Sequence, residues 1–226
     1  MSKNFCKNFL IAAICLAAVI FAGFTGNAGS SVAEQEDVIK LSREEIKSLP
    51  FDDLFKSIDP REISESVFTL VGSDYAVLTA GNPSHYNTML ASWAGFGMLF
   101  NAPVVSTFLR SNRYTLELML KEQKFTMKFF DREFRNDIMP FGMSSGRDSD
   151  EKMRNTLLTA VPTPAGNMVF KEAKLIIECD LFQVTTVSPD DFYVETTRQL
   201  IIDSHAETND YHKIVYGRIT NVWVRK

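Results

Sequence analysis

Arginines and aromatic side chains gather between Asn87 and Thr115, in the stretch NTMLASWAGFGMLFNAPVVSTFLRSNRYT. Arg110 and Arg113 stand where an apolar run gives way to an amphipathic segment. Guanidinium groups, a threonine hydroxyl and the free amides at the start of a helix together bind phosphate well. Trp93 and its small neighbours suit the wall of a pocket for a flat ring. The stretch therefore predicts a site for a planar ring system that carries a phosphate, and a pair of solvated surface arginines is the alternative.

Residues for other kinds of chemistry are not arranged for it. The sequence has no Gly-x-Ser-x-Gly elbow and no His-Glu-x-x-His pair, and its three histidines (His85, His205 and His212) lack metal-ligand spacing. We expect His212, at the start of a strand, to be a structural histidine. Cys179 lies in the apolar run LIIECDLF, where a buried and inert thiol is expected. If the protein is an enzyme, its chemistry must therefore come from a bound cofactor.

The segments around the candidate site are predicted to form short strands and one helix. TMLASWAGF is expected to be one strand and VVSTFLR a second, with NAP as the turn between them. NRYTLELMLKEQ carries apolar residues on one face and charges on the other, which predicts a short amphipathic helix. KFTMKFF follows as a further strand.

The other apolar runs are also typical of strands. Phe68–Thr79 is expected to form one or two strands that turn at GSD, and AGNPSHYN is expected to be a loop. NMVFKEAKLIIECDLFQVTTV supplies two long β-type runs, and YHKIVYGRITNVWVR is an alternating strand near the end of the chain.

Two further helices are predicted from capping signals. Ser42 and Glu45 have capping-box spacing, which predicts a helix over Arg43–Leu49. The polar loop SSGRDSDEKMRNT leads into another helix, with Asp148 or Ser149 as its N-cap. The sequence thus indicates a mainly antiparallel β protein with a few short helices. A closed or partly closed barrel is expected, because closure removes exposed strand edges.

The first residues form a separate segment. Lys3 and Lys7 precede an apolar run from Phe9 to Phe24, and small residues follow, which is the pattern of a secretory signal. Cleavage after Ala28 or after Ala33 fits the small-residue rule. The alternative is an uncleaved membrane anchor, but the run is shorter than the ~20 apolar residues that a span prefers. We expect export, to the periplasm, after removal of residues 1–33.

Charge and composition exclude several classes of protein. The 226 residues are 45% hydrophobic and 23% charged, as in a globular domain with a full core. Residues 1–33 hold two lysines and no acids, so their removal changes the formal net charge from −4 to −6. An acidic protein is not expected to bind nucleic acid. Of three cysteines only Cys179 lies outside that segment, so neither an internal disulfide nor a cysteine zinc site is expected.

Several ordered motifs resemble those of the flavin reductase family, whose members have the FMN-binding split-barrel fold, a Greek-key antiparallel barrel. NTMLASWAGFGMLFNAPVVSTFLRSNRYTLELM and FTMKFF are similar to the family's ring-binding strand, its strand that ends in arginines, and the strand after them. SSGRDSDEK, FKEAKLIIEC and HKIVYGRITNVWV resemble later segments in the same order. The resemblance spans Phe68 to Val224. It divides the chain into a signal peptide (1–33), a charged segment with a short helix (34–60) and a split-barrel domain (61–226).

The resemblance implies three groups of residues that bind non-covalent FMN. The isoalloxazine would lie against Asn87, Thr88, Met89, Ala91, Ser92 and Trp93. The ribityl phosphate would be held by Phe108, Leu109, Arg110, Arg113, Tyr114 and Thr115. Ser145, Gly146, Arg147 and Lys152 would close the site. The sequence departs from the family's usual pattern at Leu90, where threonine is usual, at Ser111, where proline is usual, and at Glu151, where the lysine is displaced to Lys152.

The resemblance also implies a function. An exported FMN oxidoreductase of the flavin reductase type would take hydride from NADH or NADPH and pass it to a flavin or another acceptor. The alternatives are a flavoredoxin-like electron carrier with a protein partner, and a binding module that has lost its flavin. A homodimer with sites near its interface is implied as well, and the apolar run of Phe96, Met98, Leu99 and Phe100 is consistent with one. The alternative is that the helix over Arg43–Leu49 covers this run.

Overall fold

The fold is seen in a computed structural model, which describes residues 41–147, 151–208 and 210–226. The expected signal segment and the candidate helix caps Asp148 and Ser149 lie outside the described residues. Residues from Lys40 to Lys226 form one compact unit. Within the described ranges, no helix combines the length and the apolar character needed to cross a bilayer.

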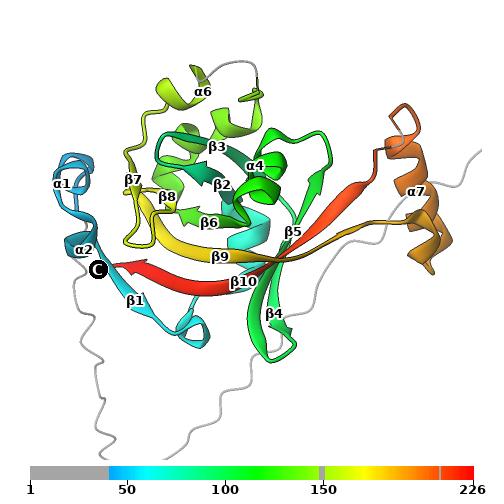
Figure 1. The fold of residues 1–226 in the computed structure, drawn as a ribbon, viewed down its shortest axis with the longest axis horizontal. Helices are drawn as coiled ribbons and strands as arrows, with labels where there is room; N and C mark the ends of the chain where they lie inside the picture. Colours follow the sequence, from blue (N-terminus) through cyan, green and yellow to red (C-terminus); the bar gives the residue numbers. More distant parts are fainter. Residues whose placement is uncertain (1–40, 148–150, 209) are drawn as a thin grey trace, which may run out of the picture. The chain divides into compact units, whose positions relative to one another are not determined.

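Antiparallel strands make up most of the domain, as the sequence predicts. The order in the main sheet is β3-β2-β6-β9-β10-β5-β4, and β1 pairs with the far half of β10 (Figure 1). Two 14-residue strands, β9 and β10, run side by side through the sheet. The strands are β1 (Phe55–Ile58), β2 (Ala76–Asn82), β3 (His85–Ala91), β4 (Ala94–Leu99), β5 (Ala102–Arg110), β6 (Lys124–Phe130), β7 (Ala160–Pro162), β8 (Met168–Phe170), β9 (Ala173–Thr186) and β10 (His212–Arg225).

The helices between these strands are short. They are α1 (Arg43–Ser48), α2 (Phe51–Leu54), α3 (Val67–Thr69), α4 (Tyr114–Glu122), α5 (Arg135–Ile138), α6 (Glu151–Arg154) and α7 (Glu195–His205), with 3-10 turns at Pro60–Glu62, Arg132–Phe134, Met139–Gly142 and Pro189–Asp191 and a π-helical turn at Leu70–Asp74. The capping box predicted at α1 is confirmed, because Ser42 and Glu45 exchange both bonds. α4 is also present as predicted and buries Leu116 and Met119, but Leu118 is buried in place of Leu120, which was also expected on the apolar face and is 49% exposed.

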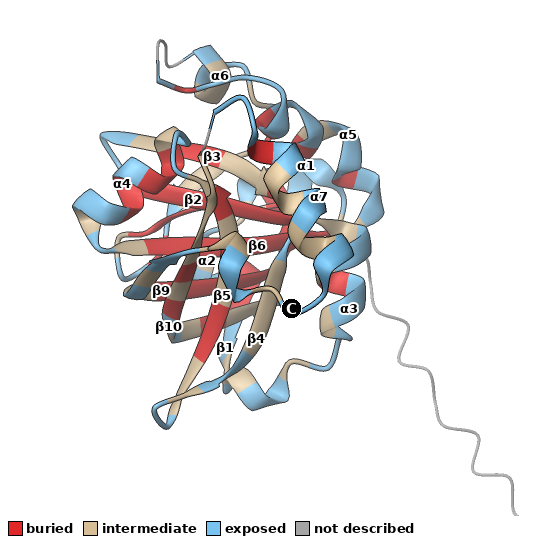
Figure 2. Ribbon diagram, turned by 90° about the vertical axis from the view of Figure 1, so that its right-hand side faces the viewer, coloured by how far each residue is buried: buried red, intermediate tan, exposed pale blue. Residues whose placement is uncertain are grey.

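The core has two layers, one on each face of β6. Phe125, Met127 and Phe129 alternate into a cluster between the strands and α4. Phe130 belongs to a second cluster, together with Phe134 and residues of α1, α2 and β8. Because both faces of β6 are covered, its residues from 125 to 130 are all buried (Figure 2). Cys179 of β9 is buried as expected, and burial raises the pKa of its thiol.

Two strand predictions near the site are wrong. TMLASWAGF is not one strand: β3 ends at Ala91 and β4 begins at Ala94, and the two lie at opposite ends of the sheet order. Ser92 and Trp93 cross from one edge strand of the sheet to the other, and the carbonyl oxygen of Trp93 accepts bonds from Phe108 N at 3.3 Å and Thr107 Oγ1 at 3.2 Å. AGNPSHYN is a tight β2–β3 hairpin rather than a loop.

The prediction of strand for all of Phe68–Thr79 is also wrong. Strand begins only at Ala76, and α3 and the π-helical turn precede it. Leu70 is the buried residue of this helical segment, while Phe68 is 91% exposed. The spacing of Phe68 and Leu70 is therefore that of an alternating strand, although the two residues lie in a helical segment and Phe68 points to solvent.

The boundary expected at residue 60 does not separate two units. β1 pairs with β10 from Phe55 to Ile58, and Ile46 and Leu54 are buried in the second cluster. The short helix and the segment after it are thus part of the barrel domain. α7 was not anticipated, because it buries only His205 and so presents no apolar stripe.

Candidate functional site

Two adjoining cavities lie where β3, the crossing at Trp93, the end of β5 and the start of α4 meet. We call the first the tryptophan cavity. It has a volume of about 190 Å³ and is lined by Met89, Leu90, Ala91, Ser92, Trp93, Phe108, Leu109, Arg110, Arg113 and His212. The second, the helix cavity, has a volume of about 100 Å³ and is lined by Asn87, Met89, Leu90, Asn112, Arg113, Tyr114, Thr115, Phe141, Gly142, Ser144, Ser145, Gly146 and Lys152. The two share Met89, Leu90 and Arg113, so they form one continuous site.

Two cations, Arg113 and Lys152, line the helix cavity, and no carboxylate is among its lining residues. Burial, and to a smaller extent the nearby charge of Arg113, together lower the pKa of Lys152 to about 8. The Lys152 ammonium donates to the carbonyl oxygen of Ser144 at 2.9 Å. Two like charges held close together in a partly buried place repel each other, and a bound anion would relieve that repulsion.

The start of α4 adds donors to the same place. Arg113 is its N-cap residue and supplies no side-chain bond to the first turn. The amides of Leu116 and Glu117 donate to the carbonyl oxygen of Arg113, whereas those of Tyr114 and Thr115 have no acceptor in the described part of the chain. The positive end of the helix dipole also favours an anion here. The cationic end predicted from Arg113 and the helix start is present in the fold.

Asn87 carries an unpaired acceptor at the floor of this cavity. Its Nδ2 donates to Thr115 Oγ1 at 2.8 Å, whereas its Oδ1 is buried without a partner among the described residues. A buried acceptor left unpaired costs about 1–3 kcal/mol, so a ligand that donates a bond there gains that free energy. Gly146 lies against the same atom, and a Cβ at this position would be 2.0 Å from Oδ1. Only glycine lets the Ser145–Gly146 segment cover Asn87 so closely.

The tryptophan cavity is aromatic and open. The Trp93 side chain is 58% exposed and its ring lies 6.5 Å from that of Phe108, nearly edge-on. The His212 ring is 5.0 Å from the Trp93 ring on the other side. An aromatic wall that continues into a cationic end is the arrangement predicted from the sequence for a planar ring with a phosphate.

His212 also lies at this site. It is the first residue of β10, as predicted, but it lines the tryptophan cavity. Its Nδ1 lies 3.0 Å from Nε2 of His205. Partial burial, His205 and Arg110 lower the pKa of His212, and Asp210 opposes them. These surroundings favour the neutral form of the ring.

Apart from Thr88 and Arg147, each residue selected from the sequence lines one of the two cavities. Thr88 points to the opposite face of β3, where its hydroxyl is 2.8 Å from that of Thr79. Arg147 forms an ion pair with Glu117 at 2.6 Å and lies over the Tyr114 ring.

Sequence reasoning missed six lining residues. They are Leu90, Asn112, Phe141, Gly142, Ser144 and His212. Leu90 and Asn112 stand inside the motifs and could have been included on that ground. Phe141, Gly142 and Ser144 follow a run of short helical turns that carries no recognisable periodicity.

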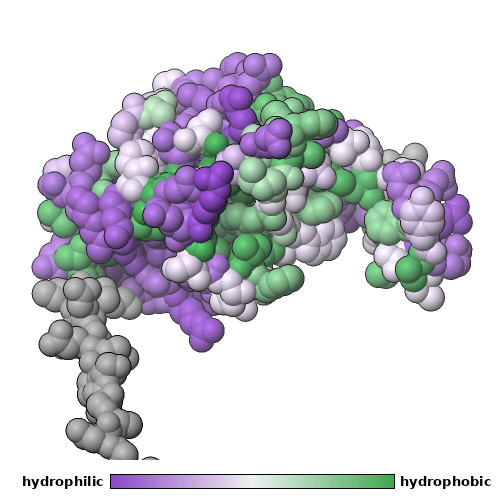
Figure 3. All heavy atoms as spheres, turned by 90° about the horizontal axis from the view of Figure 1, so that it is seen from below, coloured by the Kyte–Doolittle hydropathy of each residue, from purple (hydrophilic) through white to green (hydrophobic). Residues whose placement is uncertain are grey.

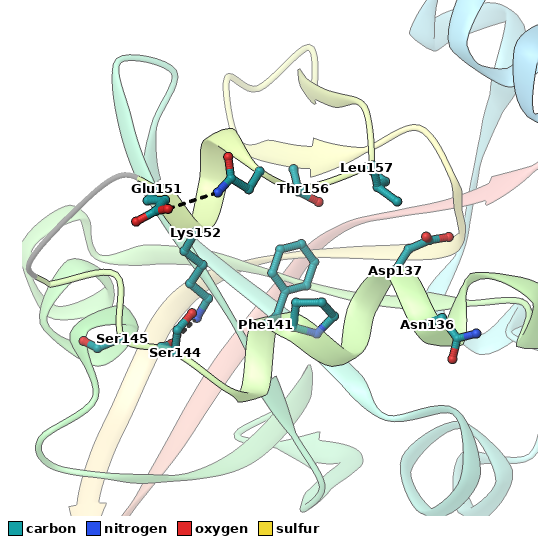
Figure 4. Close-up of a pocket in the computed structure, with 11 residues that line it drawn as sticks. Asn136, Asp137, Phe141, Ser144, Ser145, Glu151, Lys152, Thr156 and Leu157 are labelled. Atoms are coloured by element: carbon teal, nitrogen blue, oxygen red, sulfur yellow. Dashed lines mark hydrogen bonds between the residues drawn. The ribbon is translucent and has the colours of Figure 1, made fainter.

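A third and larger cavity of about 450 Å³ lies beyond Lys152 (Figure 4). Its wall includes Phe141, Ser144 and Ser145, which it shares with the helix cavity, and the acids Asp137 and Glu151. Arg43 Nη1 forms an ion pair with Asp137 Oδ2 at 2.8 Å, but no hydrogen bond to this oxygen is formed. Size alone would favour this cavity, but carboxylates disfavour a phosphate, so we place the site in the other two. In the described part of the chain, no cluster of His, Cys, Asp and Glu could hold a metal ion.

Comparison with known proteins identifies the family of the chain. The model of the flavin reductase like domain matches residues 68–226. The chain belongs to this family. No curated protein sequence gives a significant match.

Solved structures show the same fold at low identity. An FMN-binding domain of a flavin reductases-like enzyme from Shewanella baltica superposes with a TM-score of 0.55 and 11% identity, over 76% of this chain and 78% of that one. An FMN-binding protein from Thermus thermophilus with bound 1-cyclohex-2-enone gives 0.52 and 19%, over 75% and 80%. Flavoredoxin of Desulfovibrio vulgaris gives 0.50 and 21%, over 67% and 69%. The mainly antiparallel split barrel expected from the sequence is thereby confirmed.

The residues of the site fit FMN. The helix cavity offers cations and helix amides for a phosphate, and Asn87 Oδ1 offers an acceptor for a hydroxyl or an N–H. The tryptophan cavity offers an aromatic wall beside the small residues Ala91 and Ser92 for a flat ring.

Proposed function

We propose that the protein binds FMN non-covalently and works as an exported oxidoreductase of the flavin reductase type. The observation that carries the proposal is that two cations, Arg113 and Lys152, lie close together at the start of α4, next to the unpaired Oδ1 of Asn87. This arrangement needs a ligand with an anion and a hydrogen-bond donor. Bound FMN would supply the transfer of hydride or of single electrons, which no side chain of the site can perform.

The chain's own residues would bind and orient the cofactor. Arg113, Lys152 and the first amides of α4 would hold the phosphate. Asn87 would accept a bond from the ribityl chain. Trp93 and the end of β3 would fix the ring in the tryptophan cavity. Hydride transfer depends mainly on the alignment of two rings, and it requires no protein nucleophile.

A second candidate function is an electron carrier that serves a protein partner. The half-exposed Trp93 favours it, because a redox ring in this cavity would lie near the surface. Export favours it too, since NADH and NADPH are not expected outside the cytoplasm. The flavoredoxin of Desulfovibrio vulgaris, which shares the fold, has a name consistent with such a role.

One experiment separates the candidates. The purified protein is loaded with FMN and mixed with NADH or NADPH in the absence of air, and flavin absorbance is followed. Rapid bleaching by one of the nicotinamides supports the reductase. A flavin that is slow with both, but exchanges electrons quickly with a reduced redox protein, supports the carrier. Failure to bind FMN would leave the third possibility, a barrel without flavin, and would refute the proposal.

We also propose that two copies of the chain pair through the β4–β5 hairpin. Met98 and Phe100 of the β4–β5 hairpin are 59% and 84% exposed, and the Phe100 ring lies 6.5 Å from that of Phe182. Figure 3 shows hydrophobic side chains gathered on the face seen from below. The alternative that α1 covers this run is wrong, because α1 packs in the second core cluster. An exposed apolar patch of this kind is typical of an interface.

A further inference from the structure

The two histidines beside the tryptophan cavity form a directed chain of hydrogen bonds. His205 is the last residue of α7, and its Nδ1 lies 2.7 Å from the carbonyl oxygen of Ile201. A carbonyl oxygen only accepts, so Nδ1 of His205 carries the proton. The Ser204 hydroxyl agrees with this assignment: it donates to the same carbonyl at 3.0 Å and can accept from Nδ1 at 2.9 Å.

This assignment fixes the form of the next ring. In neutral His205 the other nitrogen, Nε2, has a lone pair and must accept. Its neighbour at 3.0 Å is Nδ1 of His212, which must therefore carry a proton. Nε2 of His212 is left with the lone pair. It has no partner in the described part of the chain, and it is not among the buried unpaired atoms, so it is open to solvent.

We propose that His205 is a positioning residue that fixes His212 in the Nδ1–H form, so that His212 exchanges a proton at Nε2 in the tryptophan cavity. The proposal rests on the proposed function for its chemical purpose. An acceptor molecule that receives a hydride in this cavity gains an electron pair and must also gain one proton. Protonated His212 would release that proton from Nε2 and recover one from water, while its Nδ1–H bond to His205 stays unchanged in both states.

The charges around His212 suit such an exchange. Arg110, its partner on β5, and Arg113 before α4 lower the pKa of His212, as His205 from α7 does, whereas Asp210 raises it. Asp210 is itself hydrogen-bonded by the Ser111 hydroxyl. A bound phosphate would neutralise Arg113, so we expect the pKa of His212 to rise when FMN binds. Loading the site would therefore favour the protonated form of His212.

The tautomers can be read without any activity. The full-length protein, processed by its host and labelled with ¹⁵N-histidine, contains only three histidines to assign. Two-bond ¹H–¹⁵N correlation spectra report which nitrogen of each ring is protonated. We expect Nδ1–H for both His205 and His212 in the wild type. His205→Leu removes the acceptor and should move His212 to the Nε2–H form, whereas His205→Gln keeps an acceptor and should restore Nδ1–H. Gln199→Ala, an exposed change on the same helix, should alter nothing.

The second readout is the rate of hydride transfer from NADH or NADPH to bound FMN, measured as a function of pH. General acid–base groups contribute about 10²–10⁴-fold, so misplacing one should slow transfer by ~10-fold or more in His205→Leu and shift the His212 limb of the profile. His205→Gln should regain most of the rate, and thermal melting checks that each variant folds.

Each outcome has a separate meaning. A wild-type His212 in the Nε2–H form, or a His205→Leu protein with unchanged tautomer and profile, would overturn the role of His205. A protein that binds no FMN would instead overturn the proposed function and with it the proton exchange, while the tautomer spectra still decide whether His205 orients His212.

Discussion

Replacement of Arg113 by alanine tests the phosphate end of the site. Arg113 lines both cavities and lies close enough to Lys152 to lower its pKa. A hydrogen bond to a charged group contributes about 1.5–3 kcal/mol, so FMN should bind roughly 10- to 150-fold more weakly to Arg113→Ala. Loss of the Arg113 charge should raise the pKa of Lys152, but this offsets little of the lost affinity at pH 7, because a group with a pKa of about 8 is already about 90% protonated there. Riboflavin, which lacks the phosphate, should bind both proteins almost equally.

Calorimetric titration of both flavins at one ionic strength measures these affinities. Arg147→Ala is the matched control: Arg147 is also exposed and near α4, but it pairs with Glu117 and lines neither cavity. An exposed ion pair of this kind contributes at most about 1 kcal/mol to the stability of the fold. Because Arg147 lines neither cavity, its loss should change FMN affinity by only a few-fold. Equal losses of FMN and riboflavin in Arg113→Ala would show that Arg113 supports the fold and does not bind phosphate.

Three further predictions concern pH, stability and assembly. FMN affinity should fall as pH rises through about 8, because the phosphate favours protonated Lys152, and Lys152→Met should flatten this profile in titrations between pH 6.5 and 9.5. Lys128 is fully buried and its pKa is well below normal, so the unfolded chain binds more protons than the folded chain. The free energy of unfolding should therefore rise with pH up to the unfolded pKa near ~10.4. Urea denaturation at several pH values should show a smaller rise with pH in Lys128→Met. Light scattering should find a dimer that Phe100→Glu dissociates, and a wild type that stays monomeric at high micromolar concentration would contradict the paired arrangement.

Local sequence patterns predict a helix or strand correctly where a single physical effect determines it. The capping box at Ser42, the amphipathic face of α4 and the alternation of β10 each specify one element, and each was predicted correctly. The cationic end of the site was also predictable, because Arg113 immediately precedes α4 in the sequence.

The remaining features depend on contacts between distant segments. The break between β3 and β4 is held by bonds from β5 to Trp93, which no local pattern reveals. The place of His212 depends on the register of β10 with β5, which sets it opposite Arg110. α7 carries only one buried side chain, so its sequence has no apolar period to detect. The approach of Gly146 to Asn87 joins residues far apart in the chain.

The visible absorption spectrum of the purified protein tests the central claim most directly. The protein is produced in a flavin-replete host, its spectrum is recorded, and FMN is then added to any colourless fraction. We expect a yellow protein whose flavin is released as FMN on denaturation, without a covalent link. A colourless, folded protein whose spectrum is unchanged by added FMN would contradict it.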